Sequence, residues 1–215
     1  MIIAIDGPAA AGKGTLGRRL AAHYGLAYLD SGLLYRAVGL RLLAAGGDPR
    51  DEGAAMAAAR AIKRKELDDP RLRDEEVARA ASTVAAIPRV RAALVPFQRR
   101  FAARPPGGAR GAVIDGRDIG TVVCPEATIK LFLSARAAVR AKRRLGELRQ
   151  RGQRRIYARV LAEMRERDAR DSGRAIAPLA VAEDAYVLDT TRLDADGVFS
   201  AAVALIEARG RGRKA

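Results

Sequence analysis

A glycine-rich segment stands directly behind the first short apolar run of the chain. The run "MIIAID" is followed by "GPAAAGKGT", which places Gly7, Gly12 and Lys13 in the spacing G-x-x-x-x-G-K. Clustered glycines cost conformational entropy, so they are expected where the backbone turns sharply or approaches another group closely. Between a strand and a helix, this spacing forms a loop whose backbone N–H groups face a phosphate. The segment therefore predicts a phosphate-binding loop.

Short apolar runs alternate with longer amphipathic segments along the chain. The stretch 13–25 ends at a glycine, and the stretch 31–47 begins at Ser31, a residue type that caps helices. A basic segment, 135–177, and a closing segment, 194–208, predict further helices. Strands are predicted for the apolar runs at 1–5, 26–30, 111–115, 127–133 and 184–189. This alternation predicts an α/β fold with a five-stranded parallel sheet and helices on both faces.

Residues 48–104 differ from the rest because they contain no convincing strand. Their Ala-rich segments are interrupted at Asp68, Asp69 and Pro70, and again at Pro88. Aspartate and proline break helices in this way. We expect a helical lobe here.

The charge balance favours phosphorylated ligands. The 215 residues include 40 Lys and Arg against 25 Asp and Glu, a formal net charge of +15. Such an excess attracts nucleic acid, membrane surfaces or small phosphates. Only 4% of the residues are aromatic, none is Trp, and the Tyr and Phe residues are scattered, which disfavours a base-stacking nucleic-acid module.

Other classes are disfavoured by what the sequence lacks. The single cysteine, Cys124, cannot form an internal disulfide and is expected in the core, and no Cys/His cluster has metal-ligand spacing. The N-terminus lacks the pattern of a signal peptide, and charged residues interrupt every apolar run before 18 residues. We expect a cytoplasmic protein without a membrane segment, and we expect no chemical role for His23.

The glycine-rich segment departs from most phosphate-binding loops at one position. Gly14 stands where a hydroxyl residue usually contacts the metal ion, and Thr15 follows it. This GKGT form resembles nucleoside monophosphate kinases, which hold Mg²⁺ largely through water and nucleotide oxygens. The resemblance implies a Mg²⁺ requirement with weak ligation by the protein.

Three polar motifs accompany the phosphate loop. "LDSGLLYR" and "VIDGRDIGT" follow the second and third expected strands, at the edge where open α/β sheets bind ligands. "RERDARDSGR" places Arg167 and Asp171 four residues apart on one helix face. Such a row is more often a set of solvated ion pairs, and Asp115 on its own is as readily a loop cap. Next to a phosphate loop, we expect the three motifs to converge on one cleft.

Together with "IPRVR" and "RDARDSGRAIAPL", these motifs make residues 1 to about 208 resemble bacterial cytidylate kinases. The resemblance implies that MgATP donates its γ-phosphoryl group to CMP or dCMP. It also implies a P-loop three-layer fold with a five-stranded parallel sheet, a helical acceptor-binding lobe and a short basic lid. The expected partners are these small molecules alone, with no nucleic acid required and no membrane, and the expected state is a monomer.

Carried over position by position, the resemblance implies a donor site and an acceptor site. ATP would be bound by Gly7, Pro8, Ala9, Ala10, Ala11, Gly12, Lys13, Gly14, Thr15 and Arg143. CMP would be bound by Ser31, Arg36, Ser82, Arg91, Arg117, Asp118, Arg167, Asp171 and Arg174. Catalytic roles are assigned to Lys13, Arg117 and Arg167. No residue is expected to bind Mg²⁺ directly, and Asp115 is expected to order its water ligands.

The acceptor residues fall into three implied groups. The phosphate is assigned to Arg36 and Arg117. The cytosine is assigned to Ser31, Arg91, Asp118 and Arg174. The pentose is assigned to Arg167 and Asp171, with Ser82 positioning Asp171.

The same resemblance divides the chain into parts. It implies one kinase domain, 1–208, with a core of 1–35 and 105–208, an acceptor lobe of 36–104 and a lid of 146–158. Arginines between 140 and 155 are expected to reach the triphosphate. The segment 60–77 departs from the family, because it is short and predicts helix where these enzymes carry a β-containing insert. Residues 209–215 are basic and predict a disordered tail.

Two other interpretations stay open at this point. One is a different P-loop kinase that acts on another nucleotide or on a metabolite. The other is an ATP-binding protein whose basic face binds RNA or DNA.

Overall fold

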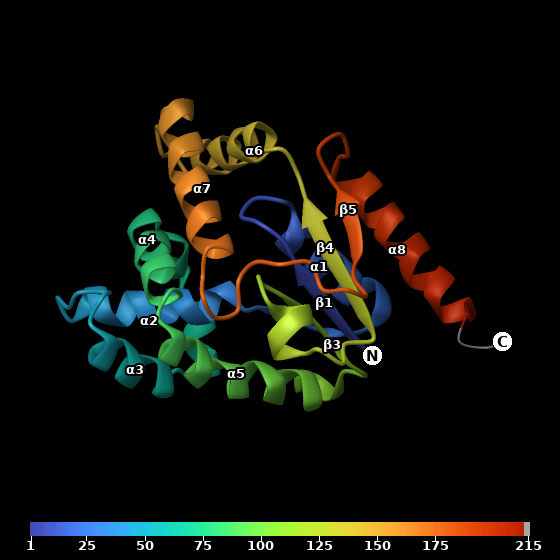
Figure 1. Ribbon diagram of the computed structural model, residues 1–215, viewed down its shortest axis with the longest axis horizontal. Helices are drawn as coiled ribbons and strands as arrows, with labels where there is room; N and C mark the ends of the chain where they lie inside the picture. The colour runs from blue at the N-terminus through green and yellow to red at the C-terminus, as the bar shows by residue number, and fades with distance from the viewer. Residues whose placement is uncertain (213–215) are drawn as a thin grey trace. The chain divides into compact units, whose positions relative to one another are not determined.

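The structure, a computed structural model, describes residues 1–212 (Figure 1). It divides into two compact units. The first comprises Met1–Tyr28 and the chain from Pro105 onward, and the second comprises Leu29–Arg104. None of the helices in the described part is both long and apolar enough to cross a membrane.

Five parallel strands form the sheet, and each lies where the sequence predicts a strand. Their order across the sheet is β2-β3-β1-β4-β5. Along β1, Ile5 is in register with Asp115 of β3, and Asp6 is in register with Phe132 of β4. The bounds are β1 Ile2–Asp6, β2 Ala27–Asp30, β3 Ala112–Asp115, β4 Ile129–Ser134 and β5 Tyr186–Asp189. The predicted α/β fold with a five-stranded parallel sheet is confirmed.

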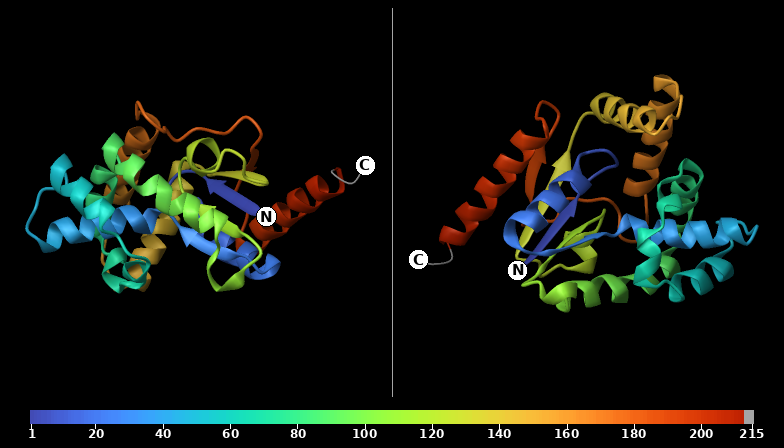
Figure 2. Two further views of the ribbon diagram at one scale, coloured as in Figure 1. Left: turned by 90° about the horizontal axis from the view of Figure 1, so that it is seen from below. Right: turned by 180° about the vertical axis from the view of Figure 1, so that it is seen from behind.

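One face of the sheet packs on helices α1 (Lys13–Tyr24) and α8 (Ala195–Gly212). The right view of Figure 2 shows α8 alongside β5. The core on this face takes alternate residues of β1 and β4 together with apolar residues of both helices, among them Ile3, Ile5, Leu131, Leu133, Leu16, Leu20, Val198 and Ala202. Because side chains alternate along a strand, Asp6 and Lys130 point to the opposite face. That face carries the short π-helical turn η4 (Ile119–Val123).

A helical hairpin follows β4. Figure 1 shows α6 (Ala137–Gln150) beginning beyond the tip of the β4 arrow and α7 (Tyr157–Ser172) packed beside it. Leu148, Val160 and Met164 belong to a separate apolar cluster of the hairpin, and Ala9 and Ala10 of the glycine-rich loop pack against it. The turn between the two helices lies inside the expected lid segment, 146–158.

The second unit is helical around its own core, as the sequence predicts for 48–104. Its elements are α2 (Gly32–Ala44), α3 (Glu52–Arg60), the 3-10 turns η1 (Arg64–Asp68) and η2 (Pro70–Arg73), α4 (Glu75–Val84) and α5 (Pro88–Ala103). Its core includes Leu34, Val38, Val84, Val90 and Leu94. Segment 60–77 holds the two 3-10 turns rather than a continuous helix, because Pro70 at the start of η2 cannot extend the preceding turn.

The predicted helix start after Ser31 is confirmed, because α2 begins at Gly32, although the Ser31 side chain makes no cap bond. The neighbouring Asp30 accepts the Gly32 N–H at 2.9 Å. One expectation about a helix end is wrong. The expected disordered tail, 209–215, is helical over its first four residues, because α8 continues to Gly212. Residues 213–215 lie outside the described part of the chain.

Candidate active site

The glycine-rich loop joins β1 to α1. Gly7 has φ +141°, and a Cβ atom there would lie 2.1 Å from the Leu133 carbonyl oxygen of β4. Gly12, the residue before α1, has φ +98°, and Ala10 also has a positive φ, of 57°. The two glycines therefore permit the close approach to β4 and the left-handed turn into the helix.

Lys13 opens helix α1 and turns back across the loop. Its side chain is buried, and Nζ donates a 2.8 Å hydrogen bond to the Pro8 carbonyl oxygen. The first turn of α1 contains no acidic side chain that would neutralise the positive end of the helix. The loop, the helix end and the lysine together favour a bound anion.

A buried carboxylate lies beside the second residue of α1. Asp115, at the end of β3, accepts a 2.8 Å hydrogen bond from the Tyr28 hydroxyl through Oδ2. A Cβ atom on Gly14 would lie 3.4 Å from that hydroxyl and 3.6 Å from Oδ2. Thr15 is exposed. Asp115, which is expected to order the water ligands of Mg²⁺, therefore lies beside Gly14 of the phosphate loop. Tyr28, which no sequence motif indicates, binds the same carboxylate.

The turn after β3 is anchored on Asp6. The backbone N–H of Ile119 donates to Oδ1 of Asp6 at 2.8 Å, and that of Gly120 donates to Oδ2 at 2.7 Å. Burial raises the pKa of Asp6 to about 6, against the lowering effect of these two bonds, and Asp118 raises it further. Asp118 is itself buried, and its carbonyl oxygen accepts the first hydrogen bonds of η4.

Three arginines surround Asp171 on α7. Arg117 Nε donates to Asp171 Oδ2 at 2.8 Å, Arg167 Nε lies 3.9 Å from the same oxygen, and Arg174 donates to Oδ1. The Asp171 side chain is 2% exposed. Burial opposes its ionisation, but the charges of Arg117, Arg167 and Arg174 outweigh burial and hold its pKa below the usual value. The predicted helical row and the turn after β3 therefore meet at one carboxylate.

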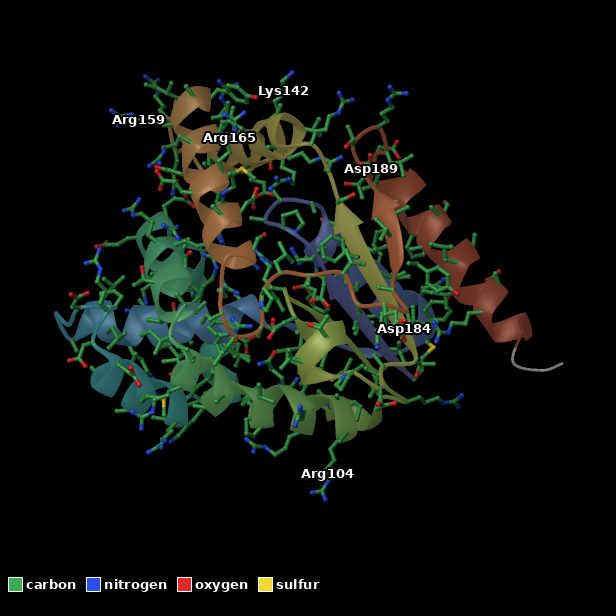
Figure 3. The ribbon with its side chains drawn as sticks, in the orientation of Figure 1. Arg104, Lys142, Arg159, Arg165, Asp184 and Asp189 are labelled. Carbon is green, nitrogen blue, oxygen red and sulfur yellow. The ribbon has the colours of Figure 1, made fainter. Side chains whose placement is uncertain are left out.

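The arginines of the hairpin reach the loop and the end of the sheet. Arg140 binds Asp168 with both Nη atoms, at 3.2 and 2.7 Å, and Nη1 also donates to the Ala9 carbonyl oxygen at 3.2 Å. Arg143 donates to Thr190 Oγ1 at 3.0 Å and to the Thr190 carbonyl oxygen at 2.6 Å. Lys142, Arg159 and Arg165 are exposed and mark the outer part of the hairpin in Figure 3.

Sequence reasoning missed four residues of this region, namely Asp6, Tyr28, Asp168 and Thr190. The one local signal was the aspartate that ends the apolar run "MIIAID", an expensive residue type for a buried strand end. The partners of the other three lie 28 or more positions away, so no local pattern reveals them.

The remaining expected acceptor residues belong to the second unit. Arg36 Nη1 donates to the Leu72 carbonyl oxygen at 2.7 Å. The buried Arg91 donates to the Ala85 carbonyl oxygen at 3.3 Å, and its guanidinium lies 5.4 Å from the centre of a tyrosine ring of α2. Ser31 and Ser82 are buried, and within residues 1–212 the Ser82 hydroxyl has no hydrogen-bond partner. Of the nine residues expected to bind CMP, four thus lie in the second unit and five lie in the first.

Comparison with known proteins decides the family. Residues 3–208 match the family described as Cytidylate kinase. The cytidylate kinase of Paramagnetospirillum magneticum is 63% identical over 205 residues, which cover 95% of this chain and 97% of that protein. The chain belongs to the cytidylate kinase family.

Other relatives of the family are similar over the full length. The cytidylate kinase of Rhodospirillum rubrum is 59% identical and covers 96% of this chain and 97% of its own. That of Rhodopseudomonas palustris strain BisA53 is 54% identical, with 99% coverage of both chains. The resemblance of the sequence motifs to cytidylate kinases is therefore confirmed.

Solved structures agree with the fold at low identity. A gluconokinase from Sinorhizobium meliloti 1021 has a TM-score of 0.52 and 13% identity, and covers 99% of this chain and 94% of its own. An uncharacterized protein from Eubacterium ventriosum has a TM-score of 0.54 and 14% identity, with coverage of 96% and 98%. The fold of this chain is thus similar to the folds of these two solved structures.

Proposed function

We propose that this chain transfers the γ-phosphoryl group of ATP to CMP and dCMP, forming CDP and dCDP. The observation that carries the proposal is the match to the cytidylate kinase family over residues 3–208, which includes both the phosphate loop and the arginine cluster at Asp171. Phosphoryl transfer needs positioning and positive charge around the migrating group more than covalent chemistry. Both features supply these requirements.

The donor end is proposed to be built from the loop, residues 7–15, with Lys13 as its charged group. Lys13 reaches the Pro8 carbonyl at 2.8 Å, so it lies over the loop where the β- and γ-phosphates would be bound. Arg143 anchors the segment after β5 to α6 and is proposed to border the same nucleotide. Arg140 joins the hairpin to Ala9 and adds positive charge near the loop.

The acceptor end is proposed to rest on paired arginines. Arg117, from the turn after β3, and Arg36, from the second unit, bind the CMP phosphate. A guanidinium binds phosphate through two parallel hydrogen bonds, which fixes the direction of attack. Asp171 holds Arg117 through Nε, which leaves the arginine's orientation defined. The acceptor phosphate is an anion, so the reaction needs no general base from the protein.

The other acceptor residues keep the roles that the family resemblance implies. Asp171 and Arg167 bind the pentose, with Ser82 positioning Asp171. The residues proposed to recognise cytosine are Ser31, Arg91, Asp118 and Arg174. A base site built from polar groups discriminates strongly, because a wrong base leaves a buried donor or acceptor unpaired.

Mg²⁺ is proposed to enter with ATP. Within residues 1–212, no three His, Cys, Asp or Glu side chains are grouped as a metal cage, and Gly14 supplies no hydroxyl. The buried Asp115 carboxylate beside Gly14 fits an ion that keeps most of its water ligands, as Mg²⁺ does. The ion neutralises charge on the phosphates when it is bound. Asp115 is proposed to accept hydrogen bonds from its waters.

The lid and the lobe are proposed to serve the same reaction. The segment 146–158 closes over ATP and excludes water, which would otherwise hydrolyse it. The second unit, Leu29–Arg104, supplies the acceptor lobe. We further propose that the protein acts as a monomer in the cytoplasm, without nucleic acid.

A panel of acceptors tests the proposed function. ATP consumption is measured with CMP, dCMP, UMP, AMP and shikimate, in the presence and absence of RNA oligonucleotides. The proposal expects CMP and dCMP to be used best and RNA to have no stimulating effect. Absence of turnover with CMP, or hydrolysis that depends on RNA, contradicts it.

A further inference from the structure

The carboxylate of Asp6 stands at the junction of the phosphate loop and the turn that carries Arg117. Asp6 is the last residue of β1 and directly precedes Gly7, the first residue of the loop. It is 5% exposed. Each of its two oxygens accepts one backbone N–H, from Ile119 at 2.8 Å and from Gly120 at 2.7 Å. One buried side chain thus binds two consecutive amides 113 and 114 positions away.

These amides close a short segment that is also held at its other end. Gly116 N donates to the Ile5 carbonyl oxygen at 2.9 Å, directly after the register pair Ile5 and Asp115. Arg117 and Asp118 are the only two residues between the two attachments. The side chains of Arg117 and Asp118 therefore extend from a backbone segment that is hydrogen-bonded to β1 at both ends.

The contact is close as well as charged. A Cβ atom on Gly120 would lie 3.4 Å from Asp6 Oδ2 and 3.1 Å from Lys130 Cδ. The turn can approach the carboxylate because position 120 has no side chain. A carboxylate suits this place because both oxygens accept, whereas an asparagine offers one acceptor and one donor.

We propose that Asp6 is a positioning residue that holds Arg117 and Asp118 at a fixed distance from the phosphate loop, so that the acceptor and donor phosphates align. The inference rests on the proposed function, because it concerns how the acceptor phosphate is placed. In this proposal Asp6 acts through the turn and not by contact with a substrate. Its retention as a buried charge, which folding disfavours, agrees with a role in function rather than in stability.

Asp6→Asn tests the proposal, because it keeps the shape of the side chain but replaces one acceptor oxygen with an NH2 donor. One of the two backbone N–H groups then loses its acceptor. We expect the KM for CMP to rise about tenfold or more, since small displacements of a positioning group are costly in rate and binding. The affinity for ATP, measured alone, stays within about threefold. Thr128→Val is the matched control, since it removes the 3.2 Å acceptor of the Ile2 N–H at the other end of β1.

A double-mutant cycle with Arg117→Lys separates positioning from a general loss of structure. If Asp6 acts through the turn, Asp6→Asn raises the KM for CMP far less in the Arg117→Lys background than in the wild type. Equal weakening of ATP and CMP binding, an unchanged KM for CMP, or additive effects in the cycle overturns the proposal.

Gly120→Ala provides a second variant if Asp6→Asn does not fold. It leaves the carboxylate in place and puts a methyl group 3.1 Å from Lys130 Cδ and 3.4 Å from Asp6 Oδ2, so that the turn or the Lys130 side chain must shift by a few tenths of an ångström. We expect the same selective rise in the KM for CMP, but a smaller one. An equal weakening of ATP and CMP binding overturns the proposal. Wild-type turnover on CMP is measured in parallel, so that failure of the proposed function is seen separately from failure of the role of Asp6.

Discussion

The hydroxyl of Tyr28 donates a 2.8 Å hydrogen bond to Oδ2 of Asp115 and so fixes the carboxylate nearest to Gly14. The ring of Tyr28 lies against Gly17 of α1, where a Cβ atom would come within 2.6 Å of it. The tyrosine therefore connects the helix that follows the phosphate loop to the end of β3. Oδ2 of Asp115 therefore already accepts a hydrogen bond from the protein itself.

We predict that Tyr28→Phe changes the Mg²⁺ dependence of the reaction more than its fold. The ring contact with Gly17 is kept, while Asp115 loses the donor that orients it. The Mg²⁺ concentration for half-maximal activity is expected to rise about threefold to tenfold, the effect of one typical intramolecular hydrogen bond. Activity is measured against Mg²⁺ at fixed ATP.

Tyr24→Phe serves as the control for this prediction. Its hydroxyl lies on the same helix as Gly17, is buried, and has no hydrogen-bond partner within residues 1–212. We expect no change in the Mg²⁺ dependence of this variant. An identical response of the two variants contradicts the role given to Tyr28.

Lys13→Met removes the charge of the phosphate loop while roughly keeping side-chain length. If Lys13 stabilises charge on the migrating phosphoryl group, kcat falls at least about a hundredfold, the scale of one lost preorganised contact. The fold is retained, because Gly7 and Gly12 shape the loop. Steady-state kinetics and the melting temperature are measured together, and near-normal turnover in the folded variant defeats the mechanism.

Arg117→Lys tests the acceptor assignment. Arg117 Nε donates to Asp171, which fixes the orientation of the guanidinium. The planar guanidinium can bind phosphate through two parallel hydrogen bonds, which an ammonium group cannot reproduce. We predict a large loss of CMP use, with ATP affinity within a few-fold of the wild type. Arg165→Lys, at an exposed position of α7, is the control and is expected to behave as the wild type. Lost ATP affinity with an unchanged KM for CMP would assign Arg117 to the donor site.

How far the sequence predicts this protein depends on the range of the interactions. All five strands are predicted, because alternation of short apolar runs with turns is a local signal that burial in a parallel sheet reinforces. The phosphate loop is predicted for the same reason, since its glycines respond to local backbone geometry. The two pairings that anchor the turn after β3, to Tyr28 and to Asp6, connect residues 87 and 113 positions apart and leave no periodic trace.

Local competition explains the differences at the helix ends. Asp30 and Ser31 both favour helix starts, and sequence alone does not say which of the two side chains binds a backbone N–H there; Asp30 does so, at Gly32. The polar residues after position 208 predict that α8 ends there. A helix already packed along the sheet propagates into such residues at little cost, since each added residue gains a hydrogen bond.

The last prediction concerns the pH dependence of stability, and Asp6 sets its sign. Burial raises the pKa of Asp6 from 3.8 to about 6, with Asp118 raising it and Lys13 lowering it among the charged groups that face it. The folded protein therefore binds a proton that the unfolded chain has released between pH 3.8 and about 6. The stability contributed by the protonated carboxyl is fully present below pH 3.8 and is lost as the pH rises through about 6. The loss is about 3 kcal/mol, since one pKa unit corresponds to about 1.4 kcal/mol.

Asp6→Asn removes this titration, so the free energy of unfolding of the wild type is expected to fall relative to that of the variant by up to this amount between pH 4 and pH 7. Urea unfolding followed by circular dichroism measures the difference, and parallel pH profiles of the two proteins contradict the raised pKa of Asp6.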